Sequence, residues 1–194
     1  MTASTRHPQA AVDPQFIDRW SPRALHSDLL TPAQISSLFE AVRWSPSCFN
    51  EQPWRIVYAA RGEPEHATLV DLLVEQNRVW AAQAPLLLYF FARRTFKKND
   101  KPNRTAAFDT GSAWLALALE ARHLGLYAHA MAGYDVARTY AALGVPESTY
   151  ESCAAVAVGA LGDPADLPEQ LRQRETPSDR EPASSFAFRG RFPG

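Results

Sequence analysis

The apolar run Leu86-Leu87-Leu88-Tyr89-Phe90-Phe91-Ala92 constrains the fold of this chain more than any other segment does. A helix that crosses a bilayer needs about 20 apolar residues, and this run is much shorter. A short continuous apolar run of this kind, bounded here by Pro85 and Arg93, is typical of a buried strand. We therefore expect the run to form a buried strand.

Further helices and strands are indicated on both sides of this run. Thr31 and Gln34 form a capping box with proline at the first helical position, which predicts the start of a helix. Residues 105–124 are small or apolar on nearly every side, so they predict a buried helix, and such burial would be easiest at a subunit interface. Residues 54–60 and 150–159 have the composition of two more strands.

Length and composition are those of one domain with a single core. The 194 residues are 46% hydrophobic and no linker divides them, so we expect a loose tail over residues 1–13 and one domain over residues 14–194. Cys48 and Cys153 are too few for a disulfide framework, and no apolar leader follows Met1, so we expect a reducing cytoplasm. Histidines and cysteines do not fall at metal-ligand spacing, and there is no G-x-G-x-x-G motif. We expect neither a metal site nor a permanently bound dinucleotide.

A polar, turn-rich loop over residues 44–55 interrupts this ordinary helix and strand material. Ser47, Asn50 and Gln52 supply hydroxyl and amide groups, while Pro46 and Pro53 restrict the backbone that carries them. The loop has the composition of a preorganised hydrogen-bonding edge for a ligand. A proline-rich connector between a helix and a strand is the alternative interpretation.

Two arginines and a serine alternate in residues 18–23. Alternation along an extended segment places Arg19, Ser21 and Arg23 on one side. Arginine binds phosphate oxygens bidentately and serine adds a neutral donor, so the pattern suits a phosphate. Taken alone, the same string is also common on solvated surfaces.

The segment 93–104 is strongly basic and contains few residues that favour a helix or a strand. It is a mobile loop over a binding site, a nucleic-acid patch, or a solvated loop without a role. The net charge of -1 and the lack of a nucleic-acid motif around the segment argue against the second interpretation. We therefore expect no nucleic acid and no membrane among the partners.

Both polar segments resemble motifs of the nitroreductase family, the FMN-dependent oxidoreductases. Residues 44–55 are similar to its APSxxNxQPW loop, and residues 18–23 to the RRSxR string that lies a similar distance ahead of that loop. Residues 125–135 are similar to its GLGxxxxxGxD strand and turn, and the resemblance spans about residues 17–191. It implies an α+β nitroreductase-like fold with a central, mostly antiparallel sheet flanked by helices, in a homodimer that exchanges C-terminal arms.

The resemblance also implies roles in binding FMN. Arg19 and Ser21 would bind the phosphate, Arg23 and Asn77 would face the pyrimidine side of the flavin, and the backbone N–H of Gly133 would donate to flavin N5. The other cofactor contacts that it implies are Trp20, Pro46, Ser47, Cys48, Asn50, Gln52, Met131, Ala132 and Arg180.

Two positions depart from the family pattern. Many members carry a lysine where this chain has Trp80, which either lines the substrate space or packs in the core. Ser178 replaces the usual lysine two residues before Arg180, which removes one charge from the phosphate site. The substrate-lining residues that we expect are Phe49, Trp80 and Phe108, and Arg189 or Arg191 is the alternative to Arg180 at the phosphate.

The function that the resemblance implies is an FMN oxidoreductase in which the cofactor carries the chemistry and no catalytic side chain is needed. NAD(P)H would deliver hydride, leave, and be followed by a nitroaromatic, quinone or enone acceptor in a ping-pong order. Two alternatives stay open: an enzyme of the same fold that handles flavin or dehalogenates, and a non-catalytic flavin-binding protein.

Overall fold

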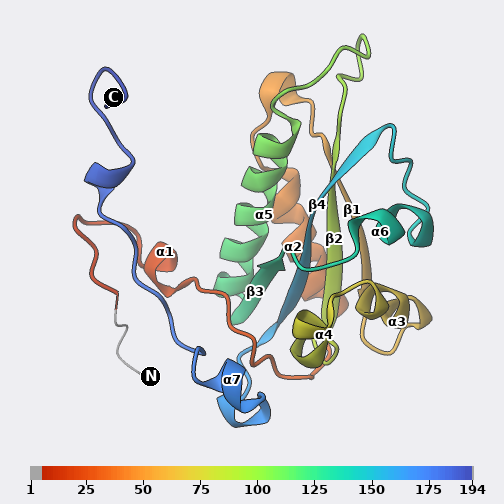
Figure 1. The fold of residues 1–194 in the computed structure, drawn as a ribbon, viewed down its shortest axis with the longest axis vertical. Coiled ribbons are helices and arrows are strands. Elements are labelled where there is room, and N and C mark those ends of the chain that lie inside the picture. Colours follow the sequence, from red (N-terminus) through yellow and green to blue (C-terminus); the bar gives the residue numbers. More distant parts are fainter. Residues whose placement is uncertain (1–5, 194) are drawn as a thin grey trace.

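The computed structural model describes residues 6–193, which form a four-stranded sheet between two layers of helices (Figure 1). The strand order is β1-β2-β4-β3, and all neighbouring strands run antiparallel. The strands are β1 Trp54–Ala60, β2 Leu86–Arg93, β3 Leu126–Met131 and β4 Tyr150–Ala160. The predicted α+β fold with a central antiparallel sheet is confirmed.

Seven α-helices accompany the sheet within residues 6–193. They are α1 Pro14–Asp18, α2 Pro32–Arg43, α3 Pro64–Asp71, α4 Glu75–Ala81, α5 Ala106–His123, α6 Val136–Ala142 and α7 Glu169–Arg172. Helices α2 and α5 cover one face of the sheet, and α3, α4 and α6 lie on the other side (Figure 1). No helix in this part of the chain combines the length and the apolar composition that crossing a membrane requires.

The second strand is buried on both faces, as its apolar run predicted. Leu86, Leu88 and Phe90 belong to the cluster formed with α2 and α5. The alternate residues Leu87 and Tyr89 belong to the cluster on the opposite face. All of them are at most 1% exposed. Because side chains alternate across a strand, a run without polar residues requires a helical layer on each face.

Helix α2 begins at the predicted capping box. Thr31 Oγ1 accepts a hydrogen bond from Gln34 N at 3.2 Å, and Gln34 Oε1 accepts one from Thr31 N at 2.9 Å. Leu38 and Val42 face the sheet. The helix ends at Arg43, with Trp44 as its C-cap, and the polar loop before β1 follows.

Helix α5 is buried on one side only. Ala113, Leu117 and Ala121 pack toward the sheet and are not exposed, whereas Phe108 is 81% and Leu115 is 41% exposed. A single chain therefore leaves this outer face open, and its burial at a subunit interface stays a prediction.

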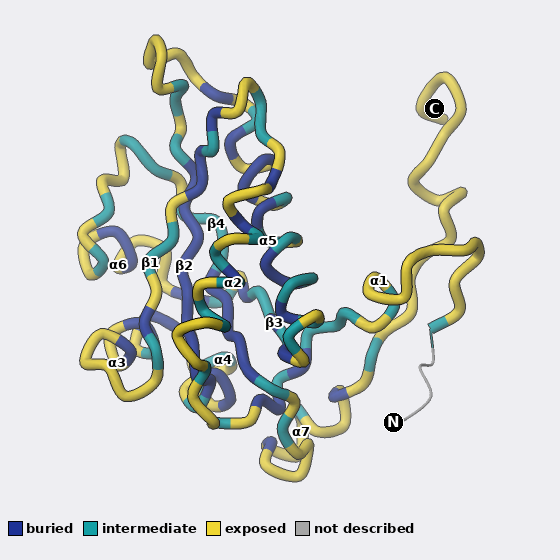
Figure 2. The backbone as a smooth tube through the Cα atoms, turned by 180° about the vertical axis from the view of Figure 1, so that it is seen from behind, coloured by how far each residue is buried: buried dark blue, intermediate teal, exposed yellow. Residues whose placement is uncertain are grey.

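The last residues form an extended C-terminal arm (residues 176–193) that leaves the body after α7 and passes the segment around α1 (Figure 1). Almost all of the arm is exposed (Figure 2). Its base is tied to the N-terminal segment, because Arg6 Nε donates to Ser178 O at 2.9 Å and Ala183 N donates to Gln9 Oε1 at 3.2 Å. Phe186 and Phe192 are 69% and 80% exposed. Of the expected N-terminal tail, residues 1–5 lie outside the described residues.

Candidate functional site

Three arginines meet at the base of the C-terminal arm, and we call Arg6, Arg19 and Arg180 the arginine cluster. Burial lowers the pKa of the Arg19 guanidinium, and the neighbouring charges of Arg6 and Arg180 lower it further. Arg19 Nη1 lies 3.4 Å from Ser21 Oγ, so the predicted alternation does place the two side chains on one side. An arginine stays charged in such surroundings, so the cluster concentrates positive charge where an anion would be stabilised.

Arg23 has a different environment from Arg19. Its Nη1 lies 3.7 Å from Glu175 Oε2, and Glu175 Oε1 accepts hydrogen bonds from Arg23 N at 2.6 Å and Ala24 N at 2.8 Å. The Glu175 side chain is almost fully buried. Glu175 therefore fixes the backbone of the arginine segment. Local patterns do not reveal this contact, because 152 positions separate the partners.

His129 on β3 supports the same segment. Its Nδ1 lies 2.9 Å from Pro22 O, and since a carbonyl oxygen can only accept, Nδ1 carries the proton and Nε2 does not. Burial lowers the pKa of His129 to about 4, and the charges of Arg23 and Arg19 add to this effect. His129 is a residue that the sequence motifs did not identify.

Trp80 lies in the core beneath His129. It is 1% exposed, and its ring centroid is 4.6 Å from that of His129. This location favours core packing over a place on the wall of the substrate space. Trp20, a predicted cofactor contact, is half-buried and packs edge-on against Tyr127 of β3 at 6.1 Å.

Asn77 and Gly133, two of the predicted cofactor contacts, lie next to each other. Asn77 Nδ2 donates to Gly133 O at 2.9 Å. A Cβ at position 133 would lie 2.6 Å from Asn77 Nδ2 and 2.9 Å from Val74 Cγ2, so a side chain there would displace Asn77. Of the neighbouring predicted contacts, Met131 is buried and Ala132 is exposed.

The loop before β1, residues 45–52, is strained, and we call it the amide loop. Phe49, Asn50 and Gln52 have φ angles of 53°, 56° and 50°, and they are three of the four non-glycine residues with positive φ in residues 6–193. Such backbone costs of order 1 kcal/mol or more per residue and clusters at functional sites. The concentration of strain in the amide loop favours a ligand-binding role over that of a simple connector.

Helix α5 holds the amide loop in place. The buried carboxylate of Asp109 accepts from Cys48 N at 3.1 Å, and Ser112 Oγ lies 3.2 Å from Pro46 O. Within the loop, Gln52 N donates to Ser47 Oγ at 2.9 Å, and Gln52 Nε2 donates to Asn50 Oδ1 at 3.1 Å. Phe108, on the first turn of α5, and Phe49 are both largely exposed.

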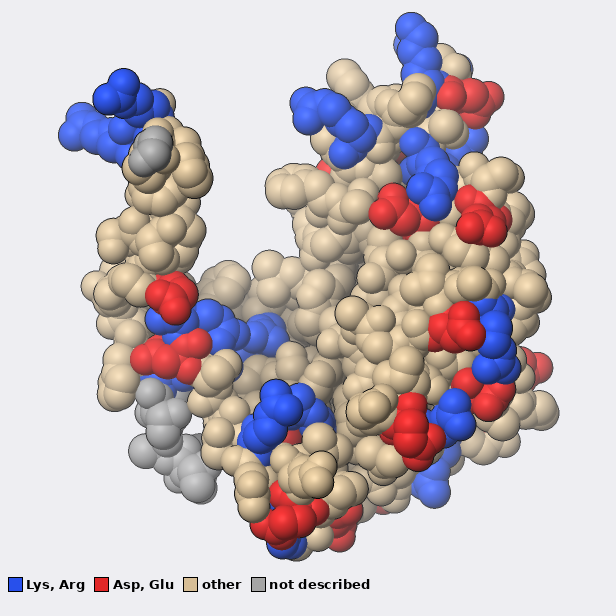
Figure 3. All heavy atoms as spheres, viewed as in Figure 1, with Lys and Arg blue, Asp and Glu red and all other residues tan. Residues whose placement is uncertain are grey.

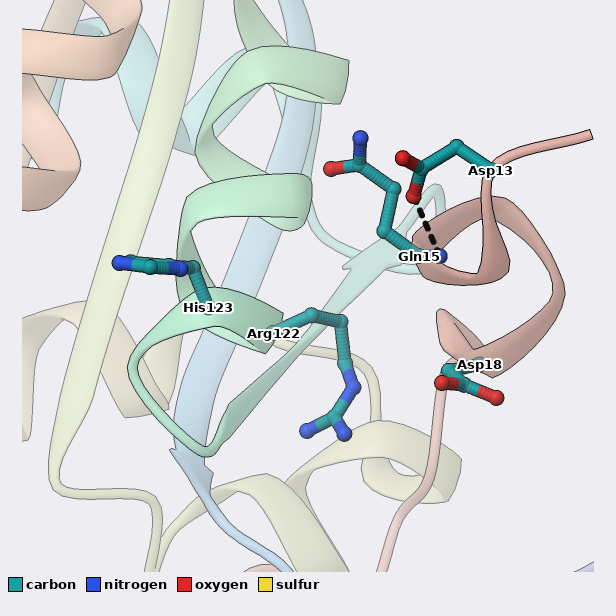
Figure 4. Close-up of a pocket in the computed structure, with 5 residues that line it drawn as sticks. All are labelled: Asp13, Gln15, Asp18, Arg122 and His123. Carbon is teal, nitrogen blue, oxygen red and sulfur yellow. Dashed lines mark hydrogen bonds between the residues drawn. The ribbon is translucent and has the colours of Figure 1, made fainter.

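The amide loop and the segment that carries Arg19 lie at opposite ends of α5. The amide loop contacts Asp109 near the start of α5. The segment that leads to Arg19 lies against its last turn, where Asp13, Gln15, Asp18, Arg122 and His123 line a pocket of 310 Å³ (Figure 4). Arg122 follows Asp109 by 13 positions in the helix, a rise of roughly 20 Å. One chain therefore does not bring the two groups together.

We name these groups the arginine half-site and the loop half-site. The arginine half-site comprises Arg19, Ser21 and Arg180 with the neighbouring Arg23, and the loop half-site comprises residues 46–52 with Phe108. The family motifs assign Asn77 and Gly133, which are joined by their hydrogen bond, to the same side of the cofactor as the arginines. No three His, Cys, Asp or Glu side chains within residues 6–193 gather as a metal site would require.

The chain belongs to the Nitroreductase family, whose model matches residues 17–80 and 73–160. A solved structure of an oxidoreductase containing FMN is 38% identical, covers 100% of this chain and 99% of its own, and superimposes with a TM-score of 0.94. A nitroreductase family protein from Clostridium difficile 630, at 18% identity, 90% and 95% coverage and a TM-score of 0.68, shares the fold.

Two relatives among curated proteins are similar over most of their length. An uncharacterized 15.4 kDa protein of Mycolicibacterium smegmatis is 38% identical over 126 residues, which are 64% of this chain and 82% of that protein. A Streptomyces griseus protein with the provisional name NADH dehydrogenase/NAD(P)H nitroreductase is 26% identical over 147 residues, 66% of this chain and 74% of that protein.

The buried His129 predicts a specific dependence of stability on pH. The unfolded chain binds a proton at His129 near the ordinary pKa of 6.5, whereas the folded chain does so only near 4. The free energy of unfolding should therefore fall as the pH drops through this window, by at most about 3 kcal/mol from this group. Chemical denaturation of wild type and His129→Gln between pH 7 and 4 should show a shallower slope for the variant.

His123→Gln, a substitution of an exposed histidine on α5, serves as the control and should keep the wild-type slope. Equal slopes for wild type and His129→Gln would show that His129 is not held neutral by the fold.

Proposed function

We propose that this protein is an FMN-dependent oxidoreductase that uses NAD(P)H to reduce small electrophilic acceptors. The observation that carries the proposal is the similarity over the full chain, at 38% identity, to an oxidoreductase containing FMN. The Streptomyces griseus relative supports NAD(P)H as the reductant through its name. Nitroaromatics, quinones and enones are the acceptors that we propose.

The arginine half-site has the chemistry that FMN requires. Arg19, Ser21 and Arg180 would hold the terminal phosphate, because a cluster of guanidinium groups stabilises a dianion through charge-assisted hydrogen bonds. Arg180 is the better candidate than Arg189 or Arg191, since its charge already acts on Arg19. Asn77 would face the flavin edge, with Gly133 kept small by the close approach of Asn77.

Bound FMN would supply hydride chemistry at N5, and the residues of the chain would bind and orient the ring. The backbone N–H of Gly133 is the donor proposed to face N5. His129 would keep the arginine segment extended while remaining neutral, so that it adds no charge beneath the flavin. NAD(P)H and the acceptor would occupy the same space in turn, in a ping-pong order.

The separation of the two half-sites supports a homodimer in which each flavin contacts both protomers. The outer face of α5, with Phe108 and Leu115, would pack against a second copy. The hollow between the C-terminal arm and the body (Figure 3) would receive that copy, with the aromatic side chains of the arm buried against it. The loop half-site of one protomer would then lie beside the arginine half-site of its partner.

The oxidoreductase proposal is tested by stopped-flow mixing. The purified protein should be yellow, and NADH or NADPH should bleach the flavin absorbance at a rate that rises with nucleotide concentration. Mixing the reduced protein with a nitroaromatic or a quinone should restore the colour. If dithionite bleaches the flavin but neither nucleotide does, the protein is a flavin-binding or flavin-handling protein instead.

Charge reversal at Arg19 tests the phosphate assignment. Arg19→Glu should weaken FMN binding by about a hundredfold or more, because it removes a charge-assisted hydrogen bond and adds repulsion. The flavin-to-protein absorbance ratio after dialysis measures the loss. Arg61→Glu, a charge reversal in the exposed turn after β1, should keep the wild-type ratio. Full flavin content in Arg19→Glu would contradict the assignment.

Substitution on the outer face of α5 tests the dimer. Leu115→Glu should raise the dimer dissociation constant by about a hundredfold or more, because an isologous interface would bury two unpaired carboxylates. Val136→Glu, at an equally exposed apolar position on α6, is the matched control and should stay dimeric. Sedimentation velocity at micromolar concentration distinguishes the two, and a wild-type protein that sediments as a folded, flavin-loaded monomer would overturn the proposal.

A further inference from the structure

A cleft of 530 Å³ opens between the amide loop and the loop that joins β2 to α5. This volume lies in the range of small-molecule sites. The residues that line the cleft are Phe49, Glu51, Phe96, Lys98, Asn99, Lys101 and Pro102. Of these, the family motifs assign a substrate role only to Phe49.

Two aromatic rings form the apolar part of the cleft. The rings of Phe49 and Phe96 meet edge to face, with centroids 6.2 Å apart. The Phe49 side chain is 90% exposed, and its backbone has a left-handed conformation. Both features are unfavourable for a phenylalanine in the free protein. The exposed ring is therefore available to a planar ligand, which would gain from stacking or edge contacts with both phenylalanines.

The lysine-bearing wall of the cleft has a defined conformation. Phe96 N donates to Lys101 O at 2.9 Å, and Asp100 N donates to Phe96 O at 2.9 Å. Thr95 and Pro102 form an isolated β-bridge across the same turn. These contacts hold Lys98 and Lys101 on the same turn as Phe96, so the rings and the ammonium groups are presented together.

Positive charge exceeds negative charge among the residues that line the cleft. Glu51 is the one carboxylate among the lining residues; it is buried, and its Oε1 accepts from Lys97 N at 2.6 Å. Arg93, the last residue of β2, pairs with Asp100, and Arg94, which follows it, pairs with Glu151. None of the ion pairs recorded for residues 6–193 involves Lys98 or Lys101. The cleft thus offers two unpaired ammonium groups beside two phenyl rings.

We propose that this cleft binds the electron acceptor and that the acceptor is a planar aromatic compound carrying an anionic group, such as an aromatic carboxylate. The ring packs against Phe49 and Phe96, and the anion pairs with Lys98 and Lys101. The acceptor role rests on the proposed oxidoreductase function, whereas the binding preference does not. Phe49 belongs to the amide loop, so the cleft adjoins the residues proposed to contact the flavin.

A binding titration monitored by ligand NMR tests the preference for anionic aromatic ligands. It uses the oxidised protein as purified, without nucleotide. The probes are 4-nitrobenzoate and its neutral isostere 4-nitrobenzamide. Wild type should bind the benzoate at least about fivefold more tightly, because two partly exposed ion pairs contribute modestly. The double variant Lys98→Glu/Lys101→Glu should weaken benzoate binding about tenfold or more and leave benzamide binding within about twofold.

Arg104→Glu is the matched control, because Arg104 lies in the same loop but does not line the cleft. It should leave both affinities near wild type. Equal affinity of wild type for the two probes would overturn the proposal, and so would a loss in Arg104→Glu as large as in the double variant. If the double variant weakens NADPH binding and leaves 4-nitrobenzoate unaffected, the cleft serves the nucleotide and the proposal is wrong.

These measurements separate the inference from the proposed function. Failure of NAD(P)H to bleach the flavin would refute the oxidoreductase but leave the binding comparison intact. Turnover of nitroaromatics without any preference for the benzoate would refute the inference alone.

Discussion

Burial of β2 on both faces determines how the rest of the chain is arranged. A strand without a polar side needs helices above and below it, and the chain provides α2 and α5 on one face and α3, α4 and α6 on the other. Helix α5 therefore lies along the sheet with its small residues inward. Its length then separates the two half-sites, because the amide loop is fixed to its first turns and the arginine segment lies beside its last turn.

A single chain has several features that are unfavourable on their own. The amide loop has three strained residues, Arg19 lies near the like charges of Arg6 and Arg180, and the outer face of α5 exposes Phe108 and Leu115. Asp18 and Asp179 offset part of the charge of Arg6. Each of the unfavourable features becomes understandable if a ligand and a second copy complete the structure. The phosphate of a flavin would offset the arginine charges. The polar groups of the strained amide loop would contact the flavin ring, and the second copy would bury the apolar face of α5.

The parts of the fold that local patterns specify could be predicted from the sequence. The run of residues 86–92, the capping box at Thr31 and the alternation of Arg19 with Ser21 all depend on neighbours in the chain, and the structure has each of them. Periodicity suggested a helix apolar all round at residues 105–124, but the single chain covers only one of its sides. A pattern reports which side chains are apolar and not what covers them.

The contacts that organise the candidate site could not be predicted, because they join distant residues. Asp109 binds Cys48 N across 61 positions, and His129 binds Pro22 O across 107. An aspartate in a helix or a histidine in a strand does not by itself indicate a contact with a distant backbone group. Trp80 was ambiguous for the same reason: its burial beneath His129 depends on how β3 and α4 meet, which no motif records.

The central claim is that each flavin site is built from the arginine half-site of one protomer and the loop half-site of the other. Coexpression of differently tagged Arg19→Glu and Asn50→Gly/Gln52→Gly chains, with purification through both tags, isolates the mixed dimer. Glycine keeps the left-handed backbone of the loop while removing its amide side chains. If sites are shared, both variant homodimers should lose flavin, and the mixed dimer should hold flavin in its single intact site and be bleached by NAD(P)H. A mixed dimer as empty as both homodimers would contradict the account, since it would mean that each site lies within one chain.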